Sequence, residues 1–376
     1  MLIMQLFRPT FEIDECLASL RRILESGWTG TGPECKQFEE EWNGFIGSKY
    51  SLFLNSATAA LHIAIRLLNL PKQSKILTTP LTFVSTNAVI LYEGHEPVFV
   101  DVNEEDLSLC SADFANKKKQ SDAKAAIWVH YGGQISPHFY STLNANKDLQ
   151  FIEDCAHASG AYYEDGSRVG SKTNTISCFS YHSVKNLPTF DSGMLCCPSA
   201  SMLERARRLS WMGIDKDTYS RTNSNDLYKW YYQVSELGWK YNGNDIAACI
   251  ARVQLKFLDR DNEIRRRHFY SYKRNFDGYP QITLLPHLNS SAPHLIVIRV
   301  KNRDELIMAL KKRGISPGVH YLPNFEFPVF QKYYQKGSCP NAERISNEIL
   351  SLPNHLKLTQ SDIDFVSEVV IQHAKT

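Results

Sequence analysis

Short apolar runs alternate with helical patterns between about residue 50 and residue 200 of the chain. Most of the runs lack the polar alternation of a half-exposed strand, and such runs are typical of strands that are covered on both faces. The predicted strands are 50–55, 75–80, 97–102, 125–131, 149–154, 175–182 and 193–198. The pattern therefore predicts an α/β fold.

Two amphipathic segments connect the first of these strands. Residues 56–70 place one apolar stripe on a helix, and Asn55 and Ser56 stand where a helix N-cap belongs. A second helix is predicted over 83–94, ending at Gly94. Helices that connect consecutive strands in this way favour a mostly parallel sheet, which we expect to have seven strands.

The C-terminal third has a different pattern. One long amphipathic helix is predicted over 245–276, with charge gathered on one side. It is followed by a predicted strand at 293–300 and helices at 303–314 and 360–374. We expect a large domain over 1–250, including an N-terminal segment, and a smaller α+β domain over 251–376.

Composition excludes some classes of protein. The chain has 376 residues, 43% of them hydrophobic, and 42 Lys and Arg balance 40 Asp and Glu. The chain therefore lacks the excess of positive charge that would indicate a nucleic-acid or membrane partner. The N-terminus lacks a basic segment followed by an apolar one of signal-peptide length, and no stretch of 18 residues is both uncharged and apolar throughout, so we expect a cytoplasmic protein.

The nine cysteines are odd in number and scattered, and several lie in apolar runs. Reduced, buried thiols explain them best. No nearby histidines complete a metal-ligand spacing around Cys196 and Cys197, so the sequence predicts no metal site.

Three segments carry candidate chemistry. The first, LNSATAAL, places a strand end, a turn of small residues and a helix N-terminus in succession. Free amides and the positive end of the helix dipole then point to one place, where an anion such as phosphate binds well. Taken alone, the segment is better explained as an ordinary capped helix.

The second segment, FIEDCAHASGA, ends an apolar strand with Glu153 and Asp154, and His157 follows three residues after the aspartate. Ligands gather at the carboxyl ends of parallel strands, so an acid there is well placed to meet one. The alternative is that Asp154 only forms a turn.

The third segment, CFSYHSVKN, ends on Lys185, with Ser180 five residues earlier. A buried ammonium is costly unless it is paired or consumed in a covalent bond, and lysine forms Schiff bases with pyridoxal phosphate. A structural lysine is the alternative. Together the segments supply a phosphate site, a carboxylate that keeps the pyridine nitrogen protonated, and an amine for the aldehyde.

The chain resembles the nucleotide-sugar aminotransferases of the DegT/StrS family. The resemblance rests on eight segments in the family's order: GTGPECKQFEEEW (30–42), NSATAALHIAI, PLTFVSTNAVI (80–90), EPVFVDV (96–102), IEDCAHASGA, FSYHSVKN, GWKYNGNDIAA (238–248) and HYLP (320–323). It spans nearly the whole chain and implies the aspartate aminotransferase superfamily fold, fold type I, in which pyridoxal 5′-phosphate (PLP) is the cofactor.

The resemblance also implies roles for single residues. Lys185 would carry the cofactor and act in catalysis, and Asp154 would pair with its pyridine nitrogen. The remaining implied contacts are Phe83 on the ring face, His157 near the phenolic oxygen, and Ala57, Thr58 and Ser180 on the phosphate. Family members usually form homodimers with shared active sites, so Lys240 or Asn242 would act on the partner's phosphate. Trp28, Thr31, His320 and Tyr321 would line the sugar site.

The implied reaction transfers an amino group from L-glutamate to a nucleotide-linked keto-deoxysugar in ping-pong half-reactions, with pyridoxamine 5′-phosphate as the intermediate form. Aminosugar and polysaccharide biosynthesis are the implied context. The HY pair at 320–321 favours C4 over C3 of the sugar. Two alternatives stay open: a sugar dehydratase using the same cofactor, against which Lys185 counts because such relatives carry histidine there, and an inactive homologue with a regulatory or scaffold role.

The chain departs from the commonest family pattern in four places. Ala57 replaces a glycine, and Phe190, Asp191, Ser192 and Gly193 stand where G-E-G-G is usual. Lys240 stands where many members have asparagine, and Phe325 where histidine is common. We expect these changes to affect the substrate more than the cofactor chemistry.

Overall fold

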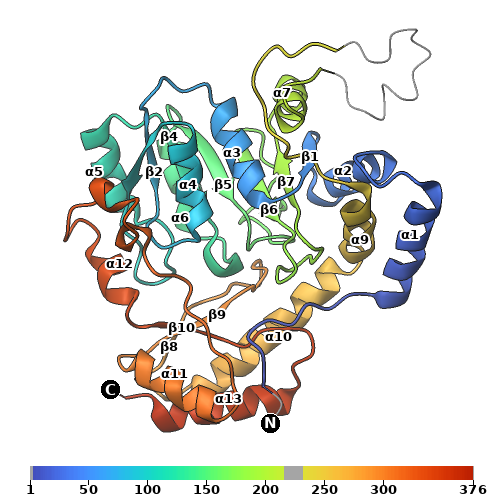
Figure 1. Ribbon diagram of the computed structural model, residues 1–376. Helices are drawn as coiled ribbons and strands as arrows, with labels where there is room; N and C mark the ends of the chain where they lie inside the picture. Colours follow the sequence, from blue (N-terminus) through green and yellow to red (C-terminus); the bar gives the residue numbers. More distant parts are fainter. Residues whose placement is uncertain (1–2, 216–231, 376) are drawn as a thin grey trace.

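The computed structural model describes residues 3–215 and 232–375, and within them the large sheet has seven strands (Figure 1). The strands are β1 (Ser51–Leu54), β2 (Lys75–Thr78), β3 (Glu96–Phe99), β4 (Ala125–Val129), β5 (Gln150–Asp154), β6 (Thr175–Ser180) and β7 (Gly193–Cys196). Their order is β1-β7-β6-β5-β4-β2-β3. The pairs between β3, β2, β4, β5 and β6 are parallel, and β7 runs antiparallel to both its neighbours, so the predicted mostly parallel seven-stranded sheet is confirmed.

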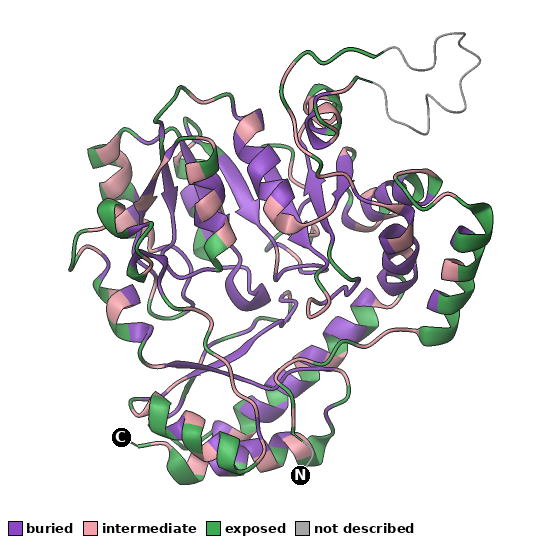
Figure 2. Cartoon of the chain, in the orientation of Figure 1, coloured by how far each residue is buried: buried purple, intermediate pink, exposed green. Residues whose placement is uncertain are grey.

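Helices cover both faces of this sheet. The flanking helices are α1 (Ile13–Ser26), α2 (Pro33–Ile46), α3 (Ala57–Leu67), α4 (Val84–Tyr92), α5 (Ser111–Ser121), α6 (His138–Ala145), α7 (Ala200–Ser210) and α9 (Asp245–Leu255). One apolar cluster joins α3, α4 and α7 to one face, and another joins α2, α5, α6 and α9 to the other. The strands between them are mostly buried (Figure 2), although Lys75 and Gln150, the first residues of β2 and β5, are exposed.

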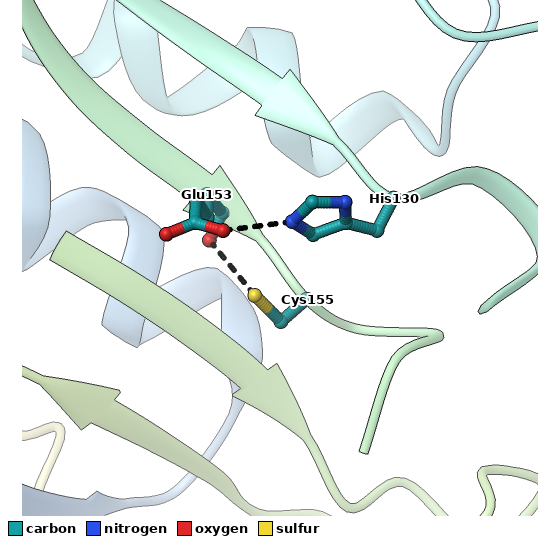
Figure 3. A group of neighbouring side chains, drawn as sticks. All are labelled: His130, Glu153 and Cys155. Atoms are coloured by element: carbon teal, nitrogen blue, oxygen red, sulfur yellow. Dashed lines mark hydrogen bonds and ion pairs between the residues drawn. The ribbon is translucent and has the colours of Figure 1, made fainter. Parts of the chain in front are cut away.

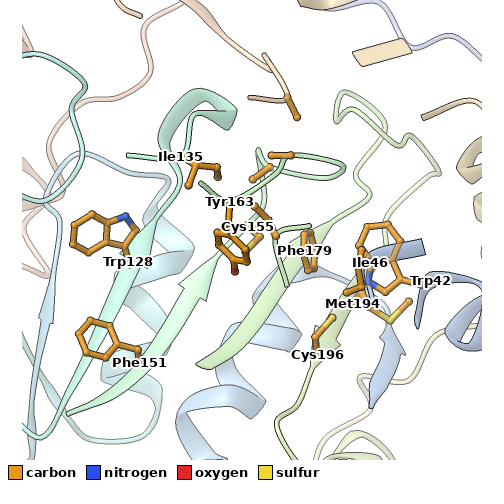
Figure 4. Close-up of a cluster of buried hydrophobic side chains, with 14 of the residues drawn as sticks. Trp42, Ile46, Trp128, Ile135, Phe151, Cys155, Tyr163, Phe179, Met194 and Cys196 are labelled. Atoms are coloured by element: carbon orange, nitrogen blue, oxygen red, sulfur yellow. The ribbon is translucent and has the colours of Figure 1, made fainter. Parts of the chain in front are cut away.

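Alternation along β5 shows how the sequence builds both clusters. Phe151 packs with Trp128 and Tyr163 on the α2 and α6 side, as Figure 4 shows, while Ile152 packs against the α3 side. Successive side chains of a strand point to opposite faces, so both must be apolar to be covered. The same alternation sends Glu153 and Asp154 to opposite faces, a point on which the site depends.

The C-terminal part has its own core. Its strands are β8 (Thr283–Leu284), β9 (Ile296–Arg299) and β10 (Ile349–Leu352), and its helices are α10 (Leu258–Phe276), α11 (Arg303–Lys312), α12 (Pro340–Ile345) and α13 (Gln360–His373). Within the described residues the antiparallel order is β10-β9-β8, with α10, α11 and α13 sharing one apolar cluster. The N-terminal segment joins this part, since Met4 donates its backbone N–H to Gly314 at 2.8 Å. The domain division at residue 250 stays a prediction.

The single helix predicted over 245–276 was wrong, because the segment forms two helices, α9 and α10, that meet at Phe257. The Phe257 N–H reaches only three residues back, to Gln254, so α9 closes with a tightened turn. Asp259 and Asp261 then stand in the first turn of α10, where acidic side chains stabilise a helix start. The break lets α9 pack into the large-sheet core and α10 into the C-terminal core.

Two further sequence features can be placed. All nine cysteines, which lie in the described ranges, are free thiols, and only Cys110 is not buried. Among residues 3–215 and 232–375, no helix has the length and apolar character needed to cross a membrane.

Candidate active site

A cavity of about 410 Å³ lies at the carboxyl ends of β5 and β6. The predicted site residues that line it are Ala57, Thr58, Phe83, Asp154, His157, Ser180, Lys185, His320 and Tyr321. They come from the starts of α3 and α4, from the ends of β5 and β6 and the loops that follow these strands, and from the loop that precedes the 3₁₀ turn Asn324–Glu326. Segments far apart in the chain therefore supply one cavity.

The start of α3 has the form of an anion site. Ser56 is the N-cap, and its hydroxyl accepts the Ala59 N–H at 3.1 Å. The N–H groups of Ala57 and Thr58 stand in the first turn, where helix geometry provides no partner. A Cβ on Gly193 would come within 2.5 Å of Ser56, so the close approach of β7 requires glycine there.

Asp154 faces the cavity from the end of β5. One carboxylate oxygen accepts the Thr86 hydroxyl at 2.8 Å, and the other accepts the Ala156 N–H at 3.1 Å. Burial raises the pKa of Asp154 above its ordinary 3.8, while these hydrogen bonds and the charge of Lys185 act in the opposite direction. Each oxygen keeps acceptor capacity for a further donor.

Lys185 lies five residues beyond β6, in the loop towards β7, rather than at the strand end. Its backbone N–H is held by the His182 carbonyl at 2.8 Å, and its side chain lines the cavity. Burial lowers the pKa of Lys185 from 10.5 to about 8, with Asp154 acting against this shift. About a tenth of the amine is therefore neutral and nucleophilic at pH 7, and about half at pH 8.

His157 is held as a neutral imidazole. Its Nδ1 accepts the Gly132 N–H at 3.2 Å, so Nε2 carries the proton and donates it to the Tyr321 hydroxyl at 3.0 Å. Burial, followed by the charge of Lys185, lowers the pKa of His157 well below 6.5. This chain of donors leaves the Tyr321 hydroxyl proton available at the cavity.

Phe83 is an apolar side chain that its neighbours leave uncovered. It is the N-cap residue of α4, it lines the cavity, and 57% of it is exposed. Its ring lies 6.2 Å from that of Tyr321, at 58°. A flat ligand ring bound here would cover the exposed face.

The sequence provides independent evidence, because residues 11–371 match the model of the DegT/DnrJ/EryC1/StrS aminotransferase family. The chain belongs to this family. It is therefore an aminotransferase, as the sequence predicted. Lys185 and Asp154, the predicted amine and acid, line the same cavity.

Individual relatives agree with the family model. The spore coat polysaccharide biosynthesis protein SpsC of Bacillus subtilis is 32% identical over 369 residues, covering 95% of this chain and 93% of SpsC. Among solved structures, Helicobacter pylori PseC, an aminotransferase involved in the biosynthesis of pseudoaminic acid, superposes with a TM-score of 0.89 at 25% identity, covering 98% of both chains. The PMP-form of Spr1654 from Streptococcus pneumoniae gives 0.89 at 25% identity, covering 97% of this chain and 98% of that one.

Four predicted residues of this aminotransferase lie apart from the cavity. Within the described residues, the cavity lining does not include Trp28, Thr31, Lys240 or Asn242. Three of them, Trp28, Thr31 and Asn242, gather in a second cluster, in which Asn242 donates to the Thr31 hydroxyl and the Trp28 indole donates to the Thr31 carbonyl at 3.1 Å. The ammonium of Lys240 lies 3.3 Å from the centre of the Trp211 ring.

The departures from the family pattern have different surroundings. Phe325 is 3% exposed and stacks on Tyr334 with ring centres 3.9 Å apart, so it belongs to a core cluster rather than to the cavity. Phe190 is 55% exposed, and the neighbouring Asp191 lines the cavity and lies 3.9 Å from His182. Ala57 is accommodated at the first position of α3.

Glu153, the neighbour of Asp154, belongs to a different group of side chains. In the described part of the chain, His130, Glu153 and Cys155 form the grouping whose ligand atoms could hold a metal ion (Figure 3). The Glu153 carboxylate, however, already accepts from His130 at 2.8 Å, Tyr163 at 2.7 Å and Ser177 at 3.2 Å, and from Thr175. Its acceptor sites are used within the fold, which makes this a structural polar network.

Some cavity residues were absent from the sequence prediction. Phe7 and His294 line the cavity and stack with ring centres 5.1 Å apart, and His182 and Thr82 line it too. Thr86 was also absent from the prediction; it does not line the cavity, but its hydroxyl donates to Asp154, which does. No local pattern marks Phe7 or His294, because only the folded C-terminal part brings them to the strand ends.

Proposed function

We propose that this chain transfers an amino group from L-glutamate to the C4 keto group of a nucleotide-linked keto-deoxysugar, with PLP as cofactor. The observation that carries the proposal is that the Lys185 amine, the Asp154 carboxylate and the first turn of α3 all face one cavity. These groups match the aldehyde, the pyridine nitrogen and the phosphate of that cofactor in chemical type. The exposed ring of Phe83 suits its flat face.

The proposed division of labour follows the contacts of each side chain. The amides of Ala57 and Thr58, with the Ser180 hydroxyl, would bind the phosphate, and the Asp154 carboxylate would accept a hydrogen bond from the protonated ring nitrogen. His157 and Tyr321 are hydrogen-bonded to each other and would meet the phenolic oxygen and the sugar. When bound, PLP supplies an aldehyde for amines and an electron-withdrawing ring.

Lys185 would do the proton transfer. A lysine whose pKa is about 8 is both a nucleophile and a base at physiological pH, which an ordinary lysine is not. Its amine would take the α-proton of the amino donor and deliver a proton to the C4′ carbon of the cofactor. In the second half-reaction it would perform the same transfers in reverse order, on the keto sugar.

We also propose a homodimer in which Lys240 or Asn242 of one subunit contacts the phosphate in the other. Support comes from the second cluster and from Lys240, because Trp28, Thr31, Lys240 and Asn242 lie outside the cavity of their own subunit. His320 would line the sugar site from within the subunit. A cytoplasmic location and a role in aminosugar or polysaccharide biosynthesis belong to the same proposal, in line with SpsC.

The test is amination of a panel of nucleotide-linked 4-keto and 3-keto sugars by the PLP-loaded protein, with products identified by mass spectrometry. We expect an aminated 4-keto sugar with L-glutamate, and none with Lys185→Ala. Lys256→Ala is the matched control, because the side chain of this lysine is 63% exposed and forms a surface ion pair with Glu15. Full transfer by Lys185→Ala would refute the proposal, and loss of water in place of gain of nitrogen would identify a dehydratase.

A further inference from the structure

Thr86 lies next to the site without entering it. It is fully buried in the first turn of α4, three residues after Phe83, and its N–H donates to the Phe83 carbonyl at 3.2 Å. Its hydroxyl contacts Asp154 Oδ2 at 2.8 Å and the Thr82 hydroxyl at 3.0 Å. One helical turn thus holds both the exposed ring of Phe83 and the carboxylate of Asp154.

The direction of these hydrogen bonds follows from the chemistry of the groups. An ionised carboxylate only accepts, so Thr86 gives its one proton to Asp154 and accepts the proton of Thr82. A hydroxyl polarised by an incoming donor is a stronger donor itself. The Thr82–Thr86 pair therefore stabilises the carboxylate form of Asp154 in a place where burial favours the neutral acid.

From this arrangement we propose that Thr86 is a positioning residue, which orients Asp154 and keeps it ionised so that it holds the proton on the pyridine nitrogen of the cofactor. The inference rests on the proposed use of PLP. With Thr86 Oγ1 on one oxygen and the Ala156 N–H on the other, the carboxylate has one orientation, and its remaining acceptor capacity faces the cavity. Without the hydroxyl, Asp154 would rotate or take the proton itself.

The test compares Thr86→Val, which keeps the shape and removes the hydroxyl, with Thr86→Ser, which keeps the hydroxyl. Thr78→Val is the matched control, because Thr78 is also fully buried and donates to Asn87 at 2.7 Å, not to Asp154. Each protein is loaded with PLP labelled with nitrogen-15, and the ring-nitrogen signal, the PLP dissociation constant, kcat and KM are measured. Thr86→Ala is the second variant if valine prevents folding.

A hydrogen bond to a charged group supports a change of about 10- to 100-fold, so we expect Thr86→Val to weaken PLP binding and lower kcat by that factor. Its ring nitrogen should shift towards the unprotonated signal, while KM for the sugar stays the same. Thr86→Ser and Thr78→Val should resemble the wild type. A wild-type ring-nitrogen signal and PLP affinity in both Thr86→Val and Thr86→Ala would overturn the inference, whereas a wild type that binds no PLP would refute the proposed function instead.

Discussion

Glu153 and Asp154 are neighbours on β5, yet their carboxylates have opposite surroundings. Glu153 points to the α2 and α6 side, where His130, Tyr163, Thr175 and Ser177 all donate to it. Figure 3 shows the bond from His130. Asp154 points to the α3 and α4 side, where, among the residues that the structure describes, its carboxylate accepts hydrogen bonds from the Thr86 hydroxyl and the Ala156 N–H alone. The two residues differ in how much of their hydrogen-bonding capacity the fold uses.

The pKa values of the two acids follow this difference. Burial alone would raise the pKa of Glu153, but hydrogen bonds from His130, Thr175 and Tyr163 hold it below its ordinary 4.5. At Asp154 burial prevails and the pKa lies above 3.8. A buried carboxylate with its capacity filled stabilises the fold, whereas one left short of donors at a cavity costs stability and is available for a ligand.

The largest effect on catalysis should come from changing Asp154, whose carboxylate has hydrogen-bonding capacity to spare. Asp154→Asn keeps the size and removes the charge that would hold the ring-nitrogen proton, so we expect kcat for amino transfer to fall about 100- to 1,000-fold. Steady-state kinetics with saturating PLP measures this. Activity within a factor of about two of the wild type would mean that Asp154 does not serve the cofactor.

Changing Glu153 should lower the stability of the fold and leave catalysis nearly unchanged. Glu153→Gln leaves His130 without its anion and turns an amide towards hydroxyl donors, so we expect a loss of about 3 kcal/mol or more in the free energy of unfolding. Urea denaturation of the apo protein measures it. The kcat of the folded fraction should stay near that of the wild type, and a variant that is stable but inactive would contradict the structural role.

Lys185 extends the comparison to a basic group, because burial lowers its pKa. Only the neutral amine attacks the PLP aldehyde, so the rate of PLP capture by the apo protein should rise about tenfold between pH 7 and pH 9, with a midpoint near the Lys185 pKa of about 8. Stopped-flow absorbance measures this rate. A midpoint near 10.5, the ordinary lysine value, would show that the fold does not tune Lys185.

The smallest effect concerns the stability of the apo protein. Since the folded pKa of Asp154 lies above its ordinary value, its charge is unfavourable to folding once the pH exceeds that folded pKa. Asp154→Asn should therefore raise the apo melting temperature at pH 7 by a few degrees, and the gain should vanish below pH 3.8. Glu153 has the opposite sign, because its contribution is present above pH 4.5 and is lost on acidification.

Much of this could be predicted from the sequence where the signal is local. The seven strands were predicted because each is a short apolar run, and Asp154, His157 and Lys185 stand at or shortly after strand ends, where a parallel sheet gathers its ligands. Their place in one cavity agrees with the prediction, while their roles stay predictions. The helix start at Asp259 also had a local signal, which the longer apolar pattern obscured.

The features that were missed depend on packing between distant segments. The opposite surroundings of Glu153 and Asp154 follow from strand alternation, but the donors around Glu153 come from three other places in the chain. The burial of Phe325 against Tyr334 and the arrival of His294 at the cavity require the C-terminal part to be folded. No pattern within a few residues carries that information.

The most direct test of the account is to find which amine holds the cofactor. The protein is loaded with PLP, reduced with sodium borohydride, digested and mapped by mass spectrometry. We predict one pyridoxyl group per chain, attached to Lys185. Attachment at any other lysine, or no stable attachment at all, would contradict the account.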